Sequence, residues 1–376
     1  MTNRSIKIIV SLVFFMVYII PIGLIFGPFN AIHNHIFATI IGLIYISLKI
    51  KSGKIKKNTL YIWILVFIVA IYTKKFGFID MIIIPILNDF IRCKNEIKNV
   101  VYKSNIAYFS IAATMVYSVM YRILGIGGRG EGEVGSGLIF TAIGEVNLTG
   151  LSLFCLALIV RKKNKFLGNV VATLGILTVS RSYMLALISV FVFNIKIIRK
   201  AMDKLIDKCT YLNFTIISSV ALFGLGIYNV YLYLNGMIVS HSLTEGFGRL
   251  FVFNDLSNYF RFLAIYLIVM IIISNPTAAF LGFTNEQFVE YGREITNSQG
   301  LLFSDIGTHN LFFSHLKMYG IAVFFEIYFV SKYLKQIITT NNFGIFLAIF
   351  LYSIILGTGL SSYWLFLTTI TLVMYE

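Results

Sequence analysis

Charged residues, prolines and cysteines are all scarce in this sequence. Only 12% of the 376 residues are charged, against roughly 25% in a typical soluble domain, and 58% are hydrophobic, which excludes an ordinary soluble domain. The four prolines leave long apolar runs uninterrupted. The three cysteines show no CxxC or Cys/His spacing, so neither a disulfide framework nor a zinc-ligand motif is predicted.

The apolar runs predict an all-α, polytopic integral membrane protein with about twelve transmembrane helices. A spanning helix needs roughly 20 mainly apolar residues, and fewer where two helices form a shielded hairpin. We expect a single transmembrane domain over residues 1–376, with helices near residues 6–26, 31–50, 59–73, 76–91, 106–124, 137–160, 166–180, 182–198, 211–234, 309–332, 343–357 and 361–375.

The basic residues predict that both termini are cytoplasmic. A net charge of +15 suggests nucleic acid as a partner, but Lys and Arg in a membrane protein normally mark the cytoplasmic side. In this topology 22 of the 31 cations lie in cytoplasmic segments, so no nucleic-acid partner is predicted. The cations left on the outer side are Lys74, Lys75, Arg122, Arg129, Arg181, Arg249, Arg261, Arg293 and Lys317.

The outer cations are mostly arginine, whereas the inner ones are mostly lysine. Topology predicts few outer cations but no change of type. The arginine fork binds phosphate oxygens in a bidentate way, while lysine acts as a point charge. The excess of arginine indicates a phosphorylated ligand on the outer face. No acidic metal pair lies on that side, and no metal or cofactor is predicted.

Two outward segments interrupt the predicted membrane helices. Residues 125–137 form a Gly-rich outer loop, read either as a backbone cradle for an anion or as a flexible loop tip. Residues 235–308 form a large outer loop that carries the candidate active site. Its apolar stretch, 262–273, is about twelve residues long and is predicted to lie at or dip into the outer interface.

Several motifs resemble the O-antigen polymerase and O-antigen ligase superfamily. The run 177–182, LTVSRS, resembles the family's helical hairpin, and residues 145–150, EVNLTG, resemble its Asn-containing helix start. The strongest similarity runs from Arg261, through Asn275-Pro276 and Gly282, to the THNLFF run at 308–313 and Gly320. The chain departs from the family pattern in the spacing of Gly282 and in Phe313, and the resemblance covers roughly residues 137–332.

The resemblance implies glycosyl transfer between polyprenyl-diphosphate-linked sugars on the outer face of the bacterial inner membrane. The expected function is polymerisation of O-antigen or capsule repeat units, metal-independent and with inversion. The donor would be a glycan on undecaprenyl diphosphate, and the acceptor a lipid-linked repeat unit. The implied partners are membrane lipids, the undecaprenyl-diphosphate-linked oligosaccharide and a chain-length regulator protein.

Arginines are the expected electrophiles for the diphosphate leaving group, whose growing charge needs fixed cations or a metal. Arg261 is the first choice for a diphosphate clamp, and Arg181, predicted at an outer hairpin tip, is the second. An interfacial anchor is the alternative for Arg261. The remaining substrate-binding candidates are Arg129, Arg249 and Arg293, for which solvated charges or salt bridges are the alternative.

His309 is the predicted general base. It is expected at a helix start, where the helix dipole lowers the pKa of an imidazole and keeps it neutral. A buried structural histidine is the alternative. Asn310 is a candidate for holding a sugar hydroxyl, and Thr308 is the candidate helix N-cap. His315 is interpreted as structural.

Two other functions stay open at this point. A ligase of the same superfamily would move the finished glycan to another acceptor, and no motif encodes that choice. A lipid-linked oligosaccharide flippase would show inverted repeats and polar residues at mid-membrane. Few such residues occur, because Asp80, Asp89 and Glu326 are isolated or near helix ends.

Overall fold

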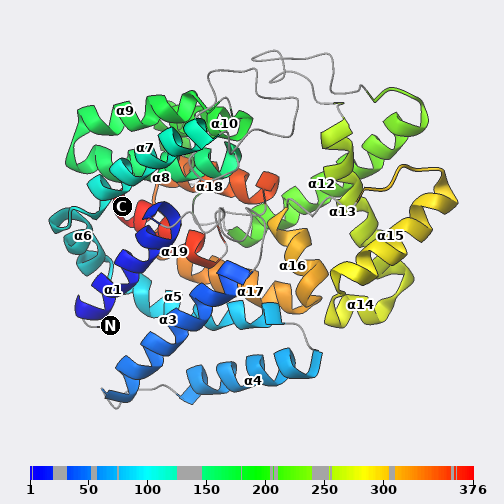
Figure 1. Cartoon of the computed structure of the whole chain (residues 1–376), viewed down its shortest axis with the longest axis horizontal. Coiled ribbons are helices and arrows are strands. Elements are labelled where there is room, and N and C mark those ends of the chain that lie inside the picture. The colour runs from blue at the N-terminus through cyan, green and yellow to red at the C-terminus, as the bar shows by residue number, and fades with distance from the viewer. Residues whose placement is uncertain are drawn as a thin grey trace. The chain divides into compact units, whose positions relative to one another are not determined.

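The structure, a computed structural model, contains helices as its regular secondary structure in the part of the chain that it describes. It describes residues 1, 3–19, 32–51, 57–73, 76–124, 146–178, 180–203, 206, 211–238, 254, 256–304, 310–356, 360 and 362–376. No strand occurs among these residues (Figure 1). The predicted all-α fold class is confirmed for this part of the chain.

The chain divides into two compact units. Unit 1 comprises Met1–Lys208, Lys332–Tyr352 and Thr358–Glu376, and unit 2 comprises Cys209–Ser331 and Ser353–Gly357. Arg181 therefore belongs to unit 1, whereas Arg261, Arg293 and Asn310 belong to unit 2.

Unit 1 contains the N-terminal helices and the C-terminal pair. Its helices are α1 (Asn3–Phe14), the π-helix η1 (Phe15–Ile19), α3 (Ile32–Lys51), α4 (Lys57–Thr73), the 3₁₀-helix η2 (Phe76–Ile82), α5 (Ile83–Ile91), α6 (Lys94–Lys103), α7 (Ile106–Leu124), α8 (Val146–Lys163), α9 (Lys165–Ile176), α10 (Arg181–Asn194), α11 (Lys196–Asp203), α18 (Phe343–Leu356) and α19 (Ser362–Val373). The last turn of α18, from Ser353 onward, belongs to unit 2.

Helix α19 forms the centre of unit 1. All of its residues are buried, and it packs against α1, α3, α6 and α8. The Phe366 ring meets the rings of Phe37 and Phe90 edge-on, with centroids 5.8 and 5.2 Å apart. The buried hydroxyls of Thr369 and Thr371 are paired, because each donates to the backbone carbonyl four residues earlier in the helix. A helix that is apolar on all sides is expected at a core position.

Asp80 of η2 and Asp89 of α5 are each paired with a side chain of α3 within unit 1. His35 on α3 lies 2.9 Å from the Asp80 carboxylate of η2, and Lys49 on α3 lies 2.8 Å from the Asp89 carboxylate of α5. Because a buried charge is costly without a partner, these pairs fix α3 against η2 and α5. They give Asp80 and Asp89 structural partners that sequence spacing did not indicate.

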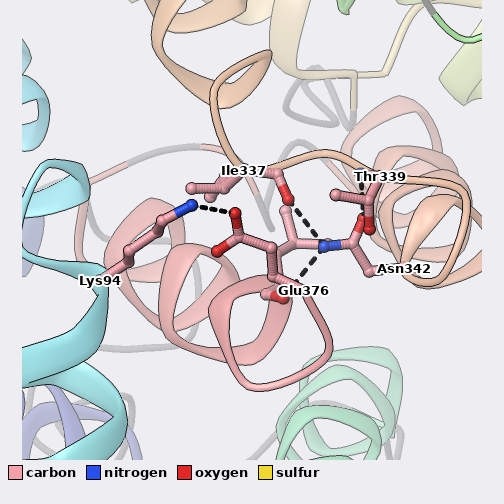
Figure 2. Close-up of polar contacts among 6 residues, drawn as sticks. Lys94, Ile337, Thr339, Asn342 and Glu376 are labelled. Carbon is pink, nitrogen blue, oxygen red and sulfur yellow. Dashed lines mark hydrogen bonds and ion pairs between the residues drawn. The ribbon is translucent and has the colours of Figure 1, made fainter.

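The end of α19 is tied to the loop before α18. The buried Asn342 amide donates to the carbonyl oxygens of Ile337, at 2.8 Å, and Leu372, at 3.0 Å. Figure 2 shows the Asn342 bond to the Ile337 carbonyl, and it also shows the Glu376 carboxylate paired with Lys94 of α6. One side chain thus satisfies two carbonyls that the loop and the helix end would otherwise leave unpaired.

Unit 2 is built on an antiparallel helix pair, α12 (Tyr211–Leu234) and α13 (Leu256–Ser274). The Tyr233 and Tyr259 rings stack with centroids 4.6 Å apart. At Gly226 the helices approach so closely that a Cβ would lie 3.1 Å from the Phe262 carbonyl oxygen. Small residues at such a crossing let two helix backbones meet, as is common in membrane bundles.

Three shorter helices follow α13 in unit 2, and a fourth begins there. They are α14 (Pro276–Leu281), α15 (Asn285–Gln299), α16 (Leu311–Tyr319) and α17 (Ala322–Leu334), which ends in unit 1. Helix α15 begins with a capping box between Thr284 and Gln287 and ends at Gly300 in the left-handed conformation. The large outer loop is therefore mostly helical over its described residues.

The structure corrects several predicted helices. The predicted helix 309–332 is wrong, because it breaks at Gly320 into α16 and α17. The predicted helix 182–198 is also wrong, because it bends by 78° between α10 and α11. The stretch predicted as 262–273 extends to Leu256–Ser274, since its polar N-terminal residues are helical. In contrast, 106–124 and 211–234 are confirmed as α7 and α12.

Helix length and composition identify one or two candidate membrane spans among the described residues. Among the described residues, α12 is long and apolar enough to span a membrane, and the bent pair α10–α11 is a second if it counts as one span. Apolar helical stretches of 10–17 residues lie in α3, α7, α9, α13, α18 and α19. The count of about twelve transmembrane helices stays a prediction.

Candidate functional site

Arg261 lies in the second turn of α13 and is half-buried. Two residues earlier, the Tyr259 hydroxyl donates to the Leu302 carbonyl oxygen at 3.3 Å. This bond ties the start of α13 to the segment that leads toward residues 305–309. The helix that carries the predicted diphosphate clamp is thus fixed next to the chain that precedes the predicted base.

Each of the two glycines of the resemblance packs against the backbone of the helix that the other one ends, within unit 2. Gly282 ends α14 with a φ of +66°, and Gly320 ends α16 with a φ of +56°. The Phe283 N–H donates to the Lys317 carbonyl at 2.7 Å, and the Ile321 N–H donates to the Ala279 carbonyl at 2.8 Å. The chain ends of α14 and α16 therefore lie side by side, and two motif segments far apart in sequence are brought together.

Asn310 is the N-cap of α16, so the helix begins at Leu311 and not at residue 309. Its side-chain oxygen accepts the Phe313 N–H at 3.0 Å, and its amide nitrogen donates to the Ile354 carbonyl at 2.9 Å. The residue is buried. The predicted N-cap at Thr308 is wrong, and the Asn310 amide already makes two hydrogen bonds, which leave one N–H and one lone pair for a sugar hydroxyl.

Arg293 lies on the exposed face of α15. Its guanidinium carbon is 5.8 Å from the centre of the Phe303 ring. A second cation, Lys317 of α16, lies 4.4 Å above the Phe288 ring, which in turn neighbours Phe303 with centroids 6.4 Å apart. Cations over aromatic rings are held by the ring quadrupole. Arg293 therefore has an aromatic contact in the structure, and its predicted role in substrate binding is untested.

Thr178 and Ser180 of the LTVSRS run lie between α9 and α10 in unit 1. Ser180 caps α10 by accepting the Tyr183 N–H at 3.3 Å, and the Tyr183 hydroxyl donates to the Ala172 carbonyl at 2.7 Å. A Cβ at Gly175 would lie 2.0 Å from the Tyr183 ring, so only glycine leaves room for it. Arg181 is the first residue of α10, and its side chain lies outside the described residues.

Three further predicted site residues lie outside the described residues. They are His309, Arg129 and Arg249. The Gly-rich segment 125–137 also lies outside them. Among the residues that the structure describes, no three His, Cys, Asp or Glu side chains are grouped so that they could hold a metal ion.

Sequence reasoning missed an ion pair between His315 of α16 and Glu326 of α17. Nδ1 of His315 lies 2.8 Å from the Glu326 carboxylate, and both side chains are mostly buried, with 14% and 15% exposed. The sequence signal was Glu326 itself, which stands alone in an apolar run. A carboxylate inside a membrane requires a partner. The chain break at Gly320 lets α17 place the Glu326 carboxylate against His315 of α16.

Comparison with known proteins finds no relative of this chain. No protein-family model matches the chain, and neither a curated protein nor a solved structure does.

Proposed function

We propose that this chain is an integral membrane glycosyltransferase that polymerises lipid-linked glycan repeat units. The donor is a glycan on undecaprenyl diphosphate, and the acceptor is a single lipid-linked repeat unit at the outer face of the bacterial inner membrane. The proposal includes about twelve spans with both termini cytoplasmic and a single membrane domain. Lipid substrates and membrane lipids are its partners, together with a chain-length regulator protein.

Exposed apolar side chains support the membrane location. On α12, Ile217 and Val220 are 68% and 69% exposed, and on α4 Ile71 is 73% exposed. Soluble monomers rarely expose contiguous apolar patches of more than a few hundred Å². Helices with one buried polar stripe and outward aliphatic side chains suit lipid better than water.

The observation that carries the proposed chemistry is the backbone hydrogen bonding beside Gly282 and Gly320, from Phe283 to Lys317 and from Ile321 to Ala279. It joins the helix after Asn275-Pro276 to the helix after Asn310, and both pack against α13, which bears Arg261. Segments that resemble one family motif, but lie far apart in sequence, thus form one structural group. A chance resemblance of scattered residues would not require them to be neighbours.

In the proposed reaction, an acceptor hydroxyl oxygen attacks the anomeric carbon of the donor sugar. A new glycosidic C–O bond forms as the bond from that carbon to the diphosphate oxygen breaks, with inversion. His309 takes the hydroxyl proton, and undecaprenyl diphosphate leaves with the bonding electron pair. Arg261 stabilises the charge that develops on the leaving diphosphate, which requires the cation to be fixed in advance.

The test is polymerisation by the purified protein in nanodiscs with synthetic undecaprenyl-diphosphate-linked repeat units. The parent protein should produce a ladder of glycan lengths. Arg261→Ala should abolish the ladder, and Arg261→Lys should restore little of it, because a point charge loses bidentate geometry. Arg92→Ala, which removes an exposed arginine of unit 1, is the matched control and should keep the ladder.

Other outcomes identify the alternatives. Transfer only to a lipid A core or protein acceptor would indicate a ligase. Movement of the lipid-linked unit across the bilayer without bond formation would indicate a flippase. A full ladder from Arg261→Ala would remove Arg261 from the mechanism.

A further inference from the structure

Helix α11 has opposite apolar and charged faces. At 100° per residue, Ile197, Ile198, Ala201 and Met202 fall on one side, and Lys196, Arg199, Lys200 and Asp203 fall on the other. None of these residues is buried, and Ile197 is 81% exposed. The protein part that the structure describes therefore leaves Ile197 and Ala201 exposed and covers Ile198 and Met202 only in part.

The direction of α11 follows from the bend that precedes it. The apolar helix α10 ends at Asn194, and α11 departs from it at 78°. Spanning helices tilt on average about 20° from the bilayer normal. If α10 crosses the membrane, a helix at nearly a right angle to it runs close to the membrane plane. In the proposed topology this is the cytoplasmic surface.

The charges of α11 indicate which surface covers it. Its polar face carries three cations and one carboxylate, and Arg199 is additionally hydrogen-bonded to the Asn341 side chain. A basic amphipathic helix lies in the headgroup layer with its apolar side at the acyl boundary, and anionic lipids attract its cations.

We propose that α11 is an interfacial anchor that binds anionic phospholipids. Ile197, Ile198 and Met202 enter the acyl boundary, while Lys196 and Lys200 contact lipid phosphates. The anchor fixes the inner end of α10, and through it the hairpin that carries Arg181 at the other end of the same helix. This inference rests on the proposed membrane location and is independent of glycosyl transfer.

The test is lipid quenching of a fluorophore on α11. An NBD label is placed at Ile197→Cys in a Cys209→Ser background, because the other two cysteines, Cys93 and Cys155, are buried. The protein is reconstituted in phosphatidylcholine nanodiscs that contain the same small fraction of doxyl-labelled phosphatidylglycerol or doxyl-labelled phosphatidylcholine. Asp203→Cys carries the label on the opposite face as the matched position.

Both doxyl lipids should quench the label at residue 197 more than the label at residue 203. Doxyl-phosphatidylglycerol should quench it at least about twofold more than doxyl-phosphatidylcholine, because anionic lipid gathers at the cations. The double variant Lys196→Gln/Lys200→Gln should remove the difference between the two doxyl lipids. The label at residue 197 should still be quenched more than the label at residue 203.

Two results would overturn the inference. Absence of quenching by either lipid would mean that water or another protein surface, including a second copy of this chain, covers α11. Equal quenching by the two lipids in the parent protein would remove the anionic-lipid site. Neither readout uses enzymatic activity, so a failure of the proposed glycosyl transfer leaves this result interpretable.

Discussion

Gly282 ends α14 and packs against the backbone of α16, while Gly320 ends α16 and packs against the backbone of α14. A Cβ at Gly282 would lie 2.5 Å from the Lys317 carbonyl oxygen, and a Cβ at Gly320 would lie 2.5 Å from the Phe280 carbonyl oxygen. Both glycines have positive φ with ψ of −171° and −138°. Each position thus excludes a side chain twice, through its dihedral angles and through its neighbour.

Replacement of either glycine by alanine should destabilise unit 2. Strain in this region of φ and ψ costs of order 1–3 kcal/mol, and the clash with a carbonyl oxygen adds to it. Gly300→Ala is the matched control, because Gly300 also has positive φ, +67°, but nothing within 4 Å of its Cβ position. Thermal unfolding in detergent should show a larger loss for Gly282→Ala and Gly320→Ala. Equal losses at all three positions would show that the backbone contact is unimportant.

The His315–Glu326 pair should behave as a coupled unit. His315→Leu leaves the Glu326 carboxylate buried without its partner, and breaking a buried pair costs about 3–5 kcal/mol. The double variant His315→Leu/Glu326→Leu removes both charges and should be more stable than His315→Leu alone. Unfolding of the parent, His315→Leu, Glu326→Leu and the double variant in the same detergent measures the coupling. Additive losses would contradict it.

His309 should affect the rate of the chemical step more than substrate binding. A positioned general base contributes roughly 10²- to 10⁴-fold in rate, so His309→Ala and His309→Gln should lose kcat in that range with little change in KM. The fall of kcat/KM at low pH, where the base is protonated, should disappear in the residual activity. A pH profile of the same shape in parent and variants would assign the proton transfer to another group.

Polymerisation should need no divalent metal. Arginine side chains are the proposed stabilisers of the diphosphate, so the glycan ladder should persist in EDTA. The measurement is the chain-length distribution before and after chelation, with Mg²⁺ or Mn²⁺ restored in a parallel sample. A strict metal requirement would mean that the charge-stabilising group has been misidentified, even if the Arg261 variants behave as expected.

The proposed topology places α15 at the outer face of the membrane and the start of α9 at the cytoplasmic face. Asn297 and Lys165 are exposed on these two helices, which makes them a matched pair for cysteine substitution. In intact cells, Asn297→Cys should react with a membrane-impermeant thiol reagent, whereas Lys165→Cys should react only after permeabilisation. Thr296, the neighbour of Asn297, is buried and would not report accessibility. The reverse labelling pattern would invert the topology.

Local pattern was sufficient to predict two of the helices to the residue. Helices α7 and α12 lie in continuous apolar runs, where hydrophobicity alone keeps the backbone paired within the helix. Helix breaks were not predictable in the same way. The break at Gly320 depends on the Ile321 N–H bonding to Ala279, a residue of another helix. The bend after Asn194 likewise separates the apolar helix α10 from the amphipathic helix α11, where the sequence predicts one helix over 182–198.

The candidate site shows the same division. Motif order identified Arg261, Gly282, Asn310 and Gly320 from sequence, but not that each glycine packs against the other's helix or that Asn310 is the N-cap of α16. The sequence by itself determined an all-helical, strongly apolar chain, because composition and hydrophobic period act locally. Tertiary structure decided which helix ends meet and that Glu326 pairs with His315. Those contacts join residues from different helices, and their energies depend on burial that no local pattern encodes.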